Sequence, residues 1–182
     1  MPKKILQQNE KVLRKIAKEI PLSQIKTPKI KKILREMSGA LKSQDDGVAL
    51  AAPQVGYPLR IFVVSGKIFA KDFAAKRPPR PETTPPSQGE RIKDLVFINP
   101  KISKLSREKE WVPEGCLSVR WLYGRTFRSK KATVAAYDEN GKKFTRGASG
   151  LLAQIFQHET DHLNGILFID HAKDVKEELP MK

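Results

Sequence analysis

Cysteine is nearly absent from this sequence. Only Cys116 occurs among 182 residues, so the chain cannot form an internal disulfide. This scarcity excludes the small secreted domains that depend on several disulfides for stability. The single thiol is therefore a buried apolar group, a reactive nucleophile or a metal ligand, and the functional interpretation depends on which of these it is.

Long apolar runs are also missing. The longest uninterrupted stretches, such as Val48 to Ala52, are far shorter than the roughly 18 residues that a membrane-spanning helix needs. The start, Met1-Pro2-Lys3-Lys4, leads into no apolar segment of the kind found in secretory signals. We therefore expect a cytoplasmic protein that does not enter a membrane.

Acidic residues are few relative to basic ones. The chain has 35 Lys and Arg against 20 Asp and Glu, which gives a net charge of +15 at pH 7. A charge of this size favours polyanions. No zinc-finger or RNP signature accompanies it, and aromatic residues make up only 7% of the chain. We expect electrostatic association with the ribosome, without recognition of a specific nucleic-acid sequence.

Apolar residues at helical spacing predict three helices. The first is a short helix from Asn9 to Ile20, and the second begins at Pro28 behind the N-cap residue Thr27. The third runs from Ser149, its N-cap, to Leu163, and Gly165 is positioned to end it in a left-handed turn.

The middle of the chain is rich in strand-forming residues. Runs of β-branched and aromatic side chains predict strands at 60–65, 95–99, 131–137 and 142–145. Between the last two, Asn140-Gly141 predicts a type I′ hairpin turn. Five of the 13 prolines lie between Ala74 and Gly89, so we expect an exposed loop inserted between strands at about 74–89.

The segment His158-Glu159-Thr160-Asp161-His162 forms an H-E-x-x-H array inside the third expected helix. Spacing of i and i+4 puts both imidazoles on one face, where they can share a divalent metal. Glu159 lies beside them, in position to take a proton from metal-bound water. Chance is a poor explanation of this pattern in a chain with only three histidines.

Two histidines do not complete a catalytic metal site, which usually has three protein ligands and one open position. Glu177 and Glu178 follow so closely that little chain is left to return one of them to the site. His171 lies near a polar terminus, and we expect it at the surface. Cys116 is the remaining candidate, and Gly115 before it permits an unusual backbone angle that can aim the thiolate at a metal.

Three separated blocks of the sequence, in this order, resemble the signature motifs of peptide deformylases. They are Gly47-Val48-Ala49-Leu50-Ala51-Ala52-Pro53-Gln54, Glu114-Gly115-Cys116-Leu117-Ser118 and Gln157-His158-Glu159-Thr160-Asp161-His162-Leu163. The likeness extends from about Val12 to Asp170. It implies a hydrolase that removes the formyl group from the N-terminal formylmethionine of newly made polypeptides and releases formate. It also implies one divalent metal ion, Fe²⁺ first, with Zn²⁺, Ni²⁺ or Co²⁺ as alternatives.

The same resemblance implies a role for individual residues. Cys116 and the two histidines of the array would hold the metal, and Glu159 would pass a proton from the attacking water to the departing amine. The side-chain amide of Gln54 and the backbone N–H of Leu117 would stabilise the negative charge that develops on the formyl oxygen.

The methionine side chain of the substrate also needs a pocket. The resemblance assigns this pocket to Val48, Leu151 and Ile155, although a plain core role fits these three residues equally well. Ala49 stands where the family usually has a second glycine, and its methyl group is expected to narrow the channel whose backbone pairs with the substrate.

Residues around the metal ligands are expected to support them. We expect Asp161 to hold Arg128, and Glu114 to bind solvent near the metal. The alternative for both is an ordinary surface ion pair, which would contribute little.

The resemblance and the strand-rich middle together imply one α+β domain over residues 1–182. Antiparallel strands would pack around a central helix that carries the H-E-x-x-H motif. Two alternatives stay open. A metalloprotease that cuts internal peptide bonds would share His158, Glu159 and His162 but need another third ligand. A basic RNA- or ribosome-binding module would account for the charge without any catalysis.

Overall fold

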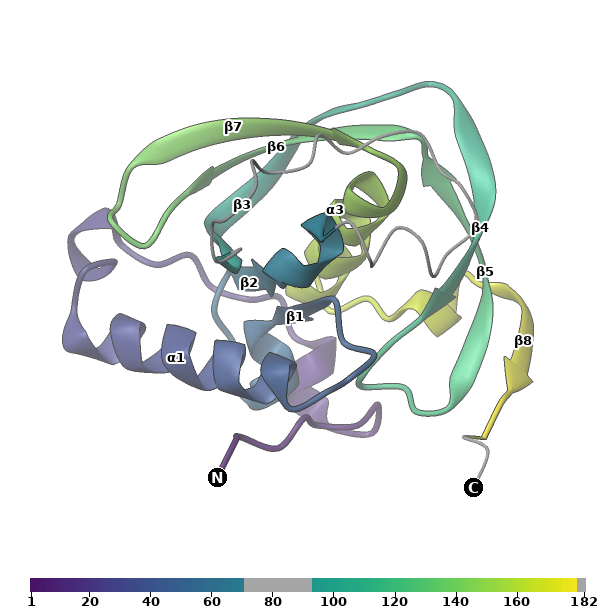
Figure 1. The fold of residues 1–182 in the computed structure, drawn as a ribbon, viewed down its shortest axis with the longest axis horizontal. Coiled ribbons are helices and arrows are strands. Elements are labelled where there is room, and N and C mark those ends of the chain that lie inside the picture. Colours follow the sequence, from purple (N-terminus) through teal and green to yellow (C-terminus); the bar gives the residue numbers. More distant parts are fainter. Residues whose placement is uncertain (71–92, 180–182) are drawn as a thin grey trace.

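Two antiparallel sheets and two α-helices make up the structure over residues 1–70 and 93–179, which are the residues that the computed structural model describes (Figure 1). The proline-rich segment expected at 74–89 lies outside them. The strands are β1 (Ala49–Ala51), β2 (Ile61–Val64), β3 (Leu95–Leu105), β4 (Lys109–Gly115), β5 (Leu122–Ser129), β6 (Lys131–Tyr137), β7 (Lys143–Ser149) and β8 (Lys173–Glu177). The α-helices are α1 (Pro28–Lys42) and α3 (Gly150–Leu163), and short 3₁₀ helices occupy Lys11–Arg14, Leu22–Gln24, Ala52–Val55, Gly66–Phe69 and Phe168–Asp170. In these described residues, no helix combines the length and the apolar character needed to cross a membrane.

The strands form one sheet in the order β1-β2-β3-β6-β7 and another in the order β4-β5-β8. Every neighbouring pair is antiparallel. This arrangement agrees with the expected α+β class. β1 and β4 each lie at the end of a sheet, so each has one side that no other described strand pairs with.

Helix α1 forms as the sequence predicts. The backbone N–H of Ile30 donates a hydrogen bond to the Thr27 hydroxyl at 3.5 Å, and Pro28 occupies the first helical position. The apolar stripe is buried and consists of Ile30, Ile33, Leu34, Met37, Ala40 and Leu41. Burial of this stripe against β1 and β2 holds the helix on the sheet.

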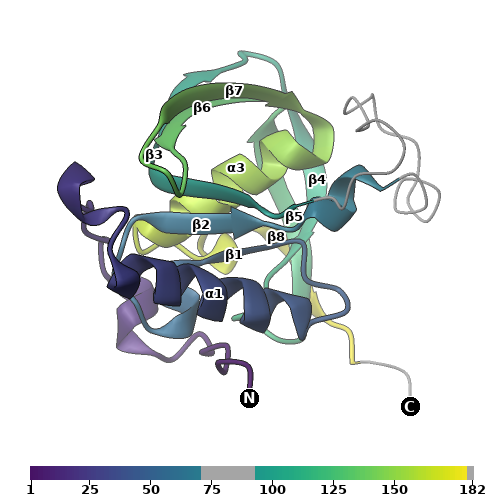
Figure 2. The same cartoon turned by 60° about the vertical axis from the view of Figure 1, so that its left-hand side comes forward.

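The helices α1 and α3 lie on opposite faces of the sheet that begins with β1 and β2 (Figure 2). Alternation of side chains along the strands explains the division. Leu50 and Val63 point into the α1 cluster, whereas Ala49 and Phe62 point into the α3 cluster. β1 and β2 are therefore buried on both sides, and most residues of α3 are buried as well.

The helix expected from Asn9 to Ile20 does not form. A 3₁₀ turn at Lys11–Arg14 replaces it, and Ile16 is 74% exposed, so the apparent apolar stripe is not buried as one face. The backbone in this region bonds to distant segments: the N–H of Ala17 donates to the carbonyl of Leu163 at 2.9 Å. Tertiary hydrogen bonds thus replace the local helical ones.

The hairpin of β6 and β7 has the expected strands but a different turn. Of Asn140 and Gly141, only Gly141 has a positive φ, at 76°, whereas a type I′ turn requires positive φ at both. The Asp138 side chain accepts hydrogen bonds from the backbone N–H groups of Asn140 at 2.9 Å and Lys142 at 2.8 Å. This bonding favours a three-residue loop that ends in a left-handed glycine, so the type I′ prediction is wrong.

Helix α3 has its predicted limits, but its N-terminus differs in detail. Ser149 occupies the N-cap position without a capping hydrogen bond from its side chain. Gly165, just past the C-terminus, has φ of 75°, and a Cβ atom there would lie 2.7 Å from the carbonyl oxygen of Arg14. Both the backbone angle and the close approach require glycine at this position.

Candidate metal centre and active site

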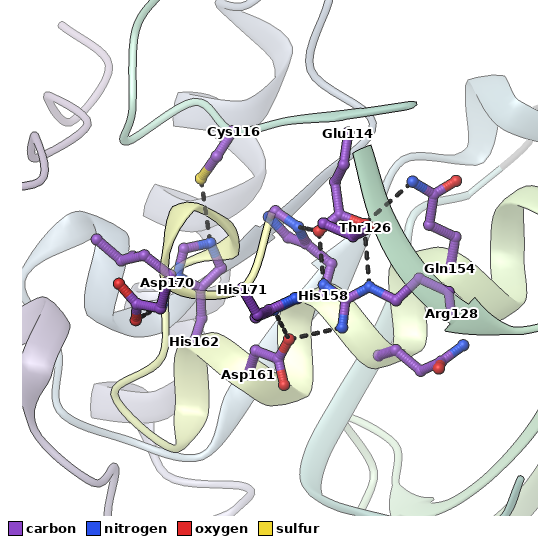
Figure 3. A network of polar contacts seen from close by, with 12 residues as sticks. Glu114, Cys116, Thr126, Arg128, Gln154, His158, Asp161, His162, Asp170 and His171 are labelled. Atoms are coloured by element: carbon purple, nitrogen blue, oxygen red, sulfur yellow. Dashed lines mark hydrogen bonds and ion pairs between the residues drawn. The ribbon is translucent and has the colours of Figure 1, made fainter. Parts of the chain in front are cut away.

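Cys116, His158 and His162 meet at one point of the structure. One ligand atom of each residue, the Cys116 sulfur and a ring nitrogen of each histidine, lies within 4.8 Å of the others. Helix α3 supplies the two histidines from successive turns, and their ring centroids are 4.9 Å apart. The Cys116 sulfur follows β4 and lies 3.2 Å from Nε2 of His162 (Figure 3).

Glu114 holds His158 in the orientation that a metal ligand needs. Nδ1 of His158 lies 2.7 Å from Oε1 of this buried carboxylate. A proton on Nδ1, shared with the carboxylate, leaves the lone pair of Nε2 available on the side of the Cys116 sulfur. One thiolate and two imidazoles form a donor set that suits a divalent metal with one further open position. The residues present therefore fit such an ion.

Glu114 also bonds to three other side chains (Figure 3). Arg128 donates to it twice, from Nη2 at 2.6 Å and Nε at 3.1 Å. The Thr126 hydroxyl donates at 2.7 Å and the Gln154 amide at 3.1 Å. Protein side chains therefore engage both carboxylate oxygens, and the expectation that Glu114 binds solvent near the metal stays a prediction.

The expected contact between Asp161 and Arg128 is present, with Nη1 of Arg128 2.7 Å from Oδ2 of Asp161. The guanidinium thus bridges Glu114, next to the first histidine of the array, and Asp161, next to the second. Arg128 and Glu114 are both buried, so these are not the surface ion pairs considered as the alternative. Breaking a buried pair leaves an uncompensated charge, which typically costs several kcal/mol.

Burial and neighbouring charges shift the pKa values of this site in different directions. Burial opposes ionisation of Glu114, yet His158 and Arg128 outweigh it and hold the pKa of this carboxyl well below its usual range. Burial also acts against the charged form of His158, but Glu114 and Cys116 raise its pKa well above the ordinary value. For His162, burial and then the charge of His158 lower the pKa well below the ordinary value.

Glu159 occupies a different environment from Glu114. The residue is only 3% exposed, and burial raises its pKa to about 7. Its Oε2 atom has no hydrogen-bond partner among the residues that the structure describes. A carboxyl group whose pKa lies near neutral pH is suited to accept and return a proton.

Gln54 and Leu117 lie at the same cavity. The amide nitrogen of Gln54 donates to the Ser118 hydroxyl at 3.0 Å and lies 3.6 Å from the Cys116 sulfur. Its amide oxygen accepts from the backbone N–H of Ala51 at 2.8 Å, which fixes the orientation of the amide. The carbonyl of Leu117 accepts from the Gln7 side chain at 3.1 Å.

A cavity of about 250 Å³ connects these groups. Its apolar lining includes the four residues expected at a substrate pocket: Val48, Ala49, Leu151 and Ile155. Glu159, His158, Cys116 and Gln54 contribute polar atoms to the same lining. The two sheets meet here, because Ala49 begins β1, Val48 directly precedes it, and Pro113 and Gly115 belong to β4.

Gly115 is required for a reason that differs from the expected one. Its φ is not positive, so no unusual backbone angle aims the thiolate. A Cβ atom at this position would instead lie 2.6 Å from Cδ1 of Tyr123, whose ring packs on the glycine. Glycine is therefore needed here because a side chain would displace Tyr123 from the wall of the cavity.

The other ligand candidates lie outside the cluster. His171 is exposed and its Nε2 lies 3.4 Å from Asp161, consistent with the surface position expected for it. Glu177 and Glu178 are exposed as well.

Sequence reasoning missed Thr126 and Gln154, which hold Glu114. Gln154 is a polar residue one turn before His158 on the buried face of α3. A polar side chain at a buried helical position next to a metal ligand indicates that it binds a partner there.

The paired helical histidines with an adjacent buried glutamate define the H-E-x-x-H type of metallohydrolase site. Comparison with known proteins gives the family. The model of the polypeptide deformylase family matches residues 2–178. The chain therefore belongs to the peptide deformylases, hydrolases that act on the N-formyl group of polypeptides during protein biosynthesis.

Individual relatives agree with the family match. The chain is 36% identical to a peptide deformylase of Christiangramia forsetii, covering 96% of this chain and 84% of the relative. It is 37% identical to one of Carboxydothermus hydrogenoformans, covering 94% of each. Among solved structures, the peptide deformylase of Thermotoga maritima has a TM-score of 0.75 at 31% identity and covers 95% of this chain and 99% of its own. A peptide deformylase from Synechococcus elongatus in complex with actinonin has a TM-score of 0.75 at 33% identity. The match covers 95% of this chain and 80% of the Synechococcus chain.

Proposed function

We propose that this chain removes the formyl group from N-terminal formylmethionine and releases formate, with Cys116, His158 and His162 holding one divalent metal ion. The observation that carries the proposal is the convergence of one sulfur and two ring nitrogens within 4.8 Å beside a cavity that also contains Glu159. Fe²⁺ is the first candidate, with Zn²⁺, Ni²⁺ or Co²⁺ as alternatives, because thiolate and imidazole ligands suit all of these ions. When bound, the ion supplies a water molecule acidic enough to act as a nucleophile at neutral pH and polarises the formyl oxygen.

Glu159 moves the proton. Its buried carboxylate accepts a proton from the attacking water and then delivers it to the nitrogen of the departing amine. In the metal-free protein burial raises the pKa of Glu159 to about 7, above its ordinary value, which suits a carboxyl group that has to accept a proton and return it.

Gln54 and Leu117 stabilise the charge on the formyl oxygen. The Gln54 amide is oriented by Ala51 and Ser118, so it does not have to reorganise when charge develops. The backbone N–H of Leu117 is the second donor that we propose. Both residues line the cavity next to Cys116, which supports this assignment.

Val48, Leu151 and Ile155 bind the methionine side chain. These residues form an apolar wall of the cavity, and two of them come from the helix that carries the histidines. β1 and β4 each have an edge that pairs with no other described strand, and both strands line the cavity, where an extended peptide can pair with a strand edge. Ala49 lies on one of these edges, so its methyl group is close to the path that we propose for the peptide.

Formate release tests the proposal. Protein purified without oxygen and loaded with Fe²⁺ is expected to release formate from formyl-Met-Ala-Ser and to leave the internal peptide bonds intact. Glu159→Gln should retain the metal and lose turnover by at least a hundredfold, because the proton carrier is gone while the ligands remain. Cleavage of an internal bond would favour the metalloprotease alternative, and formate release at the wild-type rate by Glu159→Gln would contradict the proton-transfer role.

A further inference from the structure

The outward face of β4, β5 and β8 carries exposed aromatic rings among basic side chains. Trp111 on β4 and Phe127 on β5 are paired directly across the two strands, and their ring centroids are 5.2 Å apart. Trp111 is 37% and Phe127 50% exposed. We call these rings, with Lys109, Arg125 and Lys173, the aromatic–basic face. Exposed aromatic residues in this arrangement are unusual for the surface of a strongly charged protein.

The basic side chains of this face lie against the rings. The Lys173 ammonium lies 4.9 Å from the Trp111 ring centroid, and the Arg125 guanidinium 5.9 Å from it. The Lys109 ammonium lies 5.9 Å from the centroid of Phe127. Of these three cations, only Arg125 has a carboxylate within 4.0 Å in the described part of the chain, namely Asp174 at 3.8 Å. Positive charge is therefore in excess on this face.

We infer that the aromatic–basic face binds single-stranded RNA. Proteins that bind single strands combine aromatic rings, on which bases stack, with cations that contact phosphates. Trp111 and Phe127 supply two adjacent rings, and Lys109 and Lys173 supply charges with no carboxylate within 4.0 Å among the described residues. A peptide partner would use the rings equally well, but it would leave the cations without a counterpart unless it were strongly acidic. The net charge of +15 also favours a polyanion.

The face leads toward the cavity. Along β5, Tyr123 lies on the same side as Phe127 because side chains alternate along a strand, and Tyr123 lines the cavity wall. Four residues at about 3.3 Å each separate the two positions by roughly 13 Å. RNA on this face would thus lie beside the cavity without entering it. The aromatic–basic face shares none of the residues that we assign to catalysis, so its test is independent of the proposed function.

Fluorescence anisotropy with a labelled 12-mer of uridines, titrated with the metal-loaded full chain, tests the inference. We expect Trp111→Ala combined with Phe127→Ala to weaken RNA binding about tenfold or more, because two stacking rings are lost. The same double variant should bind heparin, a polyanion without bases, as the wild type does. Trp111→Phe, which retains a ring, should keep most of the RNA affinity.

The charge contribution is tested with a matched pair of double variants. Lys109→Glu with Lys173→Glu should weaken RNA binding and flatten its salt dependence. Lys29→Glu with Lys31→Glu removes the same charge from exposed positions on α1, on another side of the molecule (Figure 1), and should change binding much less. Formate release from formyl-Met-Ala-Ser should be unchanged in all of these variants, which also checks that they fold.

Several results would overturn the inference. One is the absence of RNA binding by the wild type at low salt. Another is RNA binding by the double alanine variant as tight as that of the wild type, or an equal loss from the two pairs of lysine variants. A higher KM for long formyl-Met peptides in the double alanine variant, with RNA binding unchanged, would assign the face to the substrate peptide instead.

Discussion

Nδ1 of His158 lies 2.7 Å from Oε1 of Glu114, so a buried carboxylate orients one histidine of the candidate metal site. Arg128 in turn holds that carboxylate through two hydrogen bonds. The position of the first helical histidine therefore depends on a strand residue and on the neighbouring strand.

Glu114→Gln is expected to lower the metal affinity about 10- to 100-fold, which is the usual effect of losing the partner of a metal-binding histidine. It should also lower the free energy of unfolding, because Arg128 would lose its buried counter-charge. Metal affinity is measured by competition with a chelator and unfolding by urea. Thr126→Val removes one hydrogen bond from the same carboxylate without changing a charge, so it should have a smaller effect on both. Equal metal affinity in Glu114→Gln and the wild type would contradict the orienting role.

Cys116→Ala is expected to lose the metal during dialysis, because two histidines without the thiolate form a weak site. Metal content is measured by elemental analysis of the dialysed protein. His171→Ala is the matched control: this histidine is exposed and lies outside the cluster, so the variant should keep one equivalent of metal. Metal loss in His171→Ala with retention in Cys116→Ala would show that the third ligand is wrongly assigned.

Metal binding is expected to release protons at neutral pH. Burial disfavours the charged form of His158, but Glu114 and Cys116 raise its pKa well above the ordinary value, so the metal-free protein carries a proton that a ligand must lose. Affinity should therefore fall as the pH is lowered. Calorimetric titration of the metal in buffers with different ionisation enthalpies counts the released protons. The absence of any proton release near pH 7 would contradict this expectation.

The pH dependence of stability is expected to reveal the buried Glu159. Burial raises its pKa from 4.5 to about 7, so the unfolded state ionises first as the pH rises. The contribution of Glu159 to the stability of the metal-free folded protein should be lost between these two values and should change no further above pH 7. Each pKa unit is worth about 1.4 kcal/mol, so the loss is on the order of 3 kcal/mol.

Glu159→Gln removes this titration. Metal-free Glu159→Gln and wild type should differ little near pH 4, and the variant should become the more stable of the two by pH 8. Urea unfolding at a series of pH values measures the difference. A difference between the two proteins that stays constant from pH 4 to pH 8 would show that the carboxyl does not titrate as its burial indicates.

Local sequence patterns predicted the parts of the fold that depend on local forces. The stripe and cap of α1 are of this kind, because Thr27 and Pro28 act on the first turn whatever surrounds them. The i, i+4 spacing of His158 and His162 likewise depends only on helix geometry. The strand expected at 95–99 was correct but too short, since β3 continues to Leu105 by pairing with β6, a partner distant in the sequence.

The features that sequence reasoning missed depend on contacts between distant segments. Glu114 looked like a residue for binding solvent, and only the packing of β4 on β5 and α3 brings Arg128 and Gln154 to it. In the same way, the segment from Asn9 to Ile20 has helical spacing, but its backbone bonds to distant residues of α3, β3 and a loop. A one-dimensional pattern contains no information about which distant group satisfies a buried charge or a free N–H group.

The shape of the apolar cavity wall predicts substrate selectivity. Leu151 lines the cavity and is only partly buried, so Leu151→Phe adds volume to the proposed methionine pocket with little strain elsewhere. We expect kcat/KM for a formyl-Met peptide to fall about tenfold, mainly through KM, because one misfitting group in such a pocket typically changes selectivity by this amount. Kinetics with a formyl-Ala peptide provide the control. The alanine side chain is too short to reach the ring that Leu151→Phe introduces, so kcat/KM for this peptide should change little. Equal losses for both peptides would indicate that Leu151 acts on the folded structure rather than on the methionine side chain.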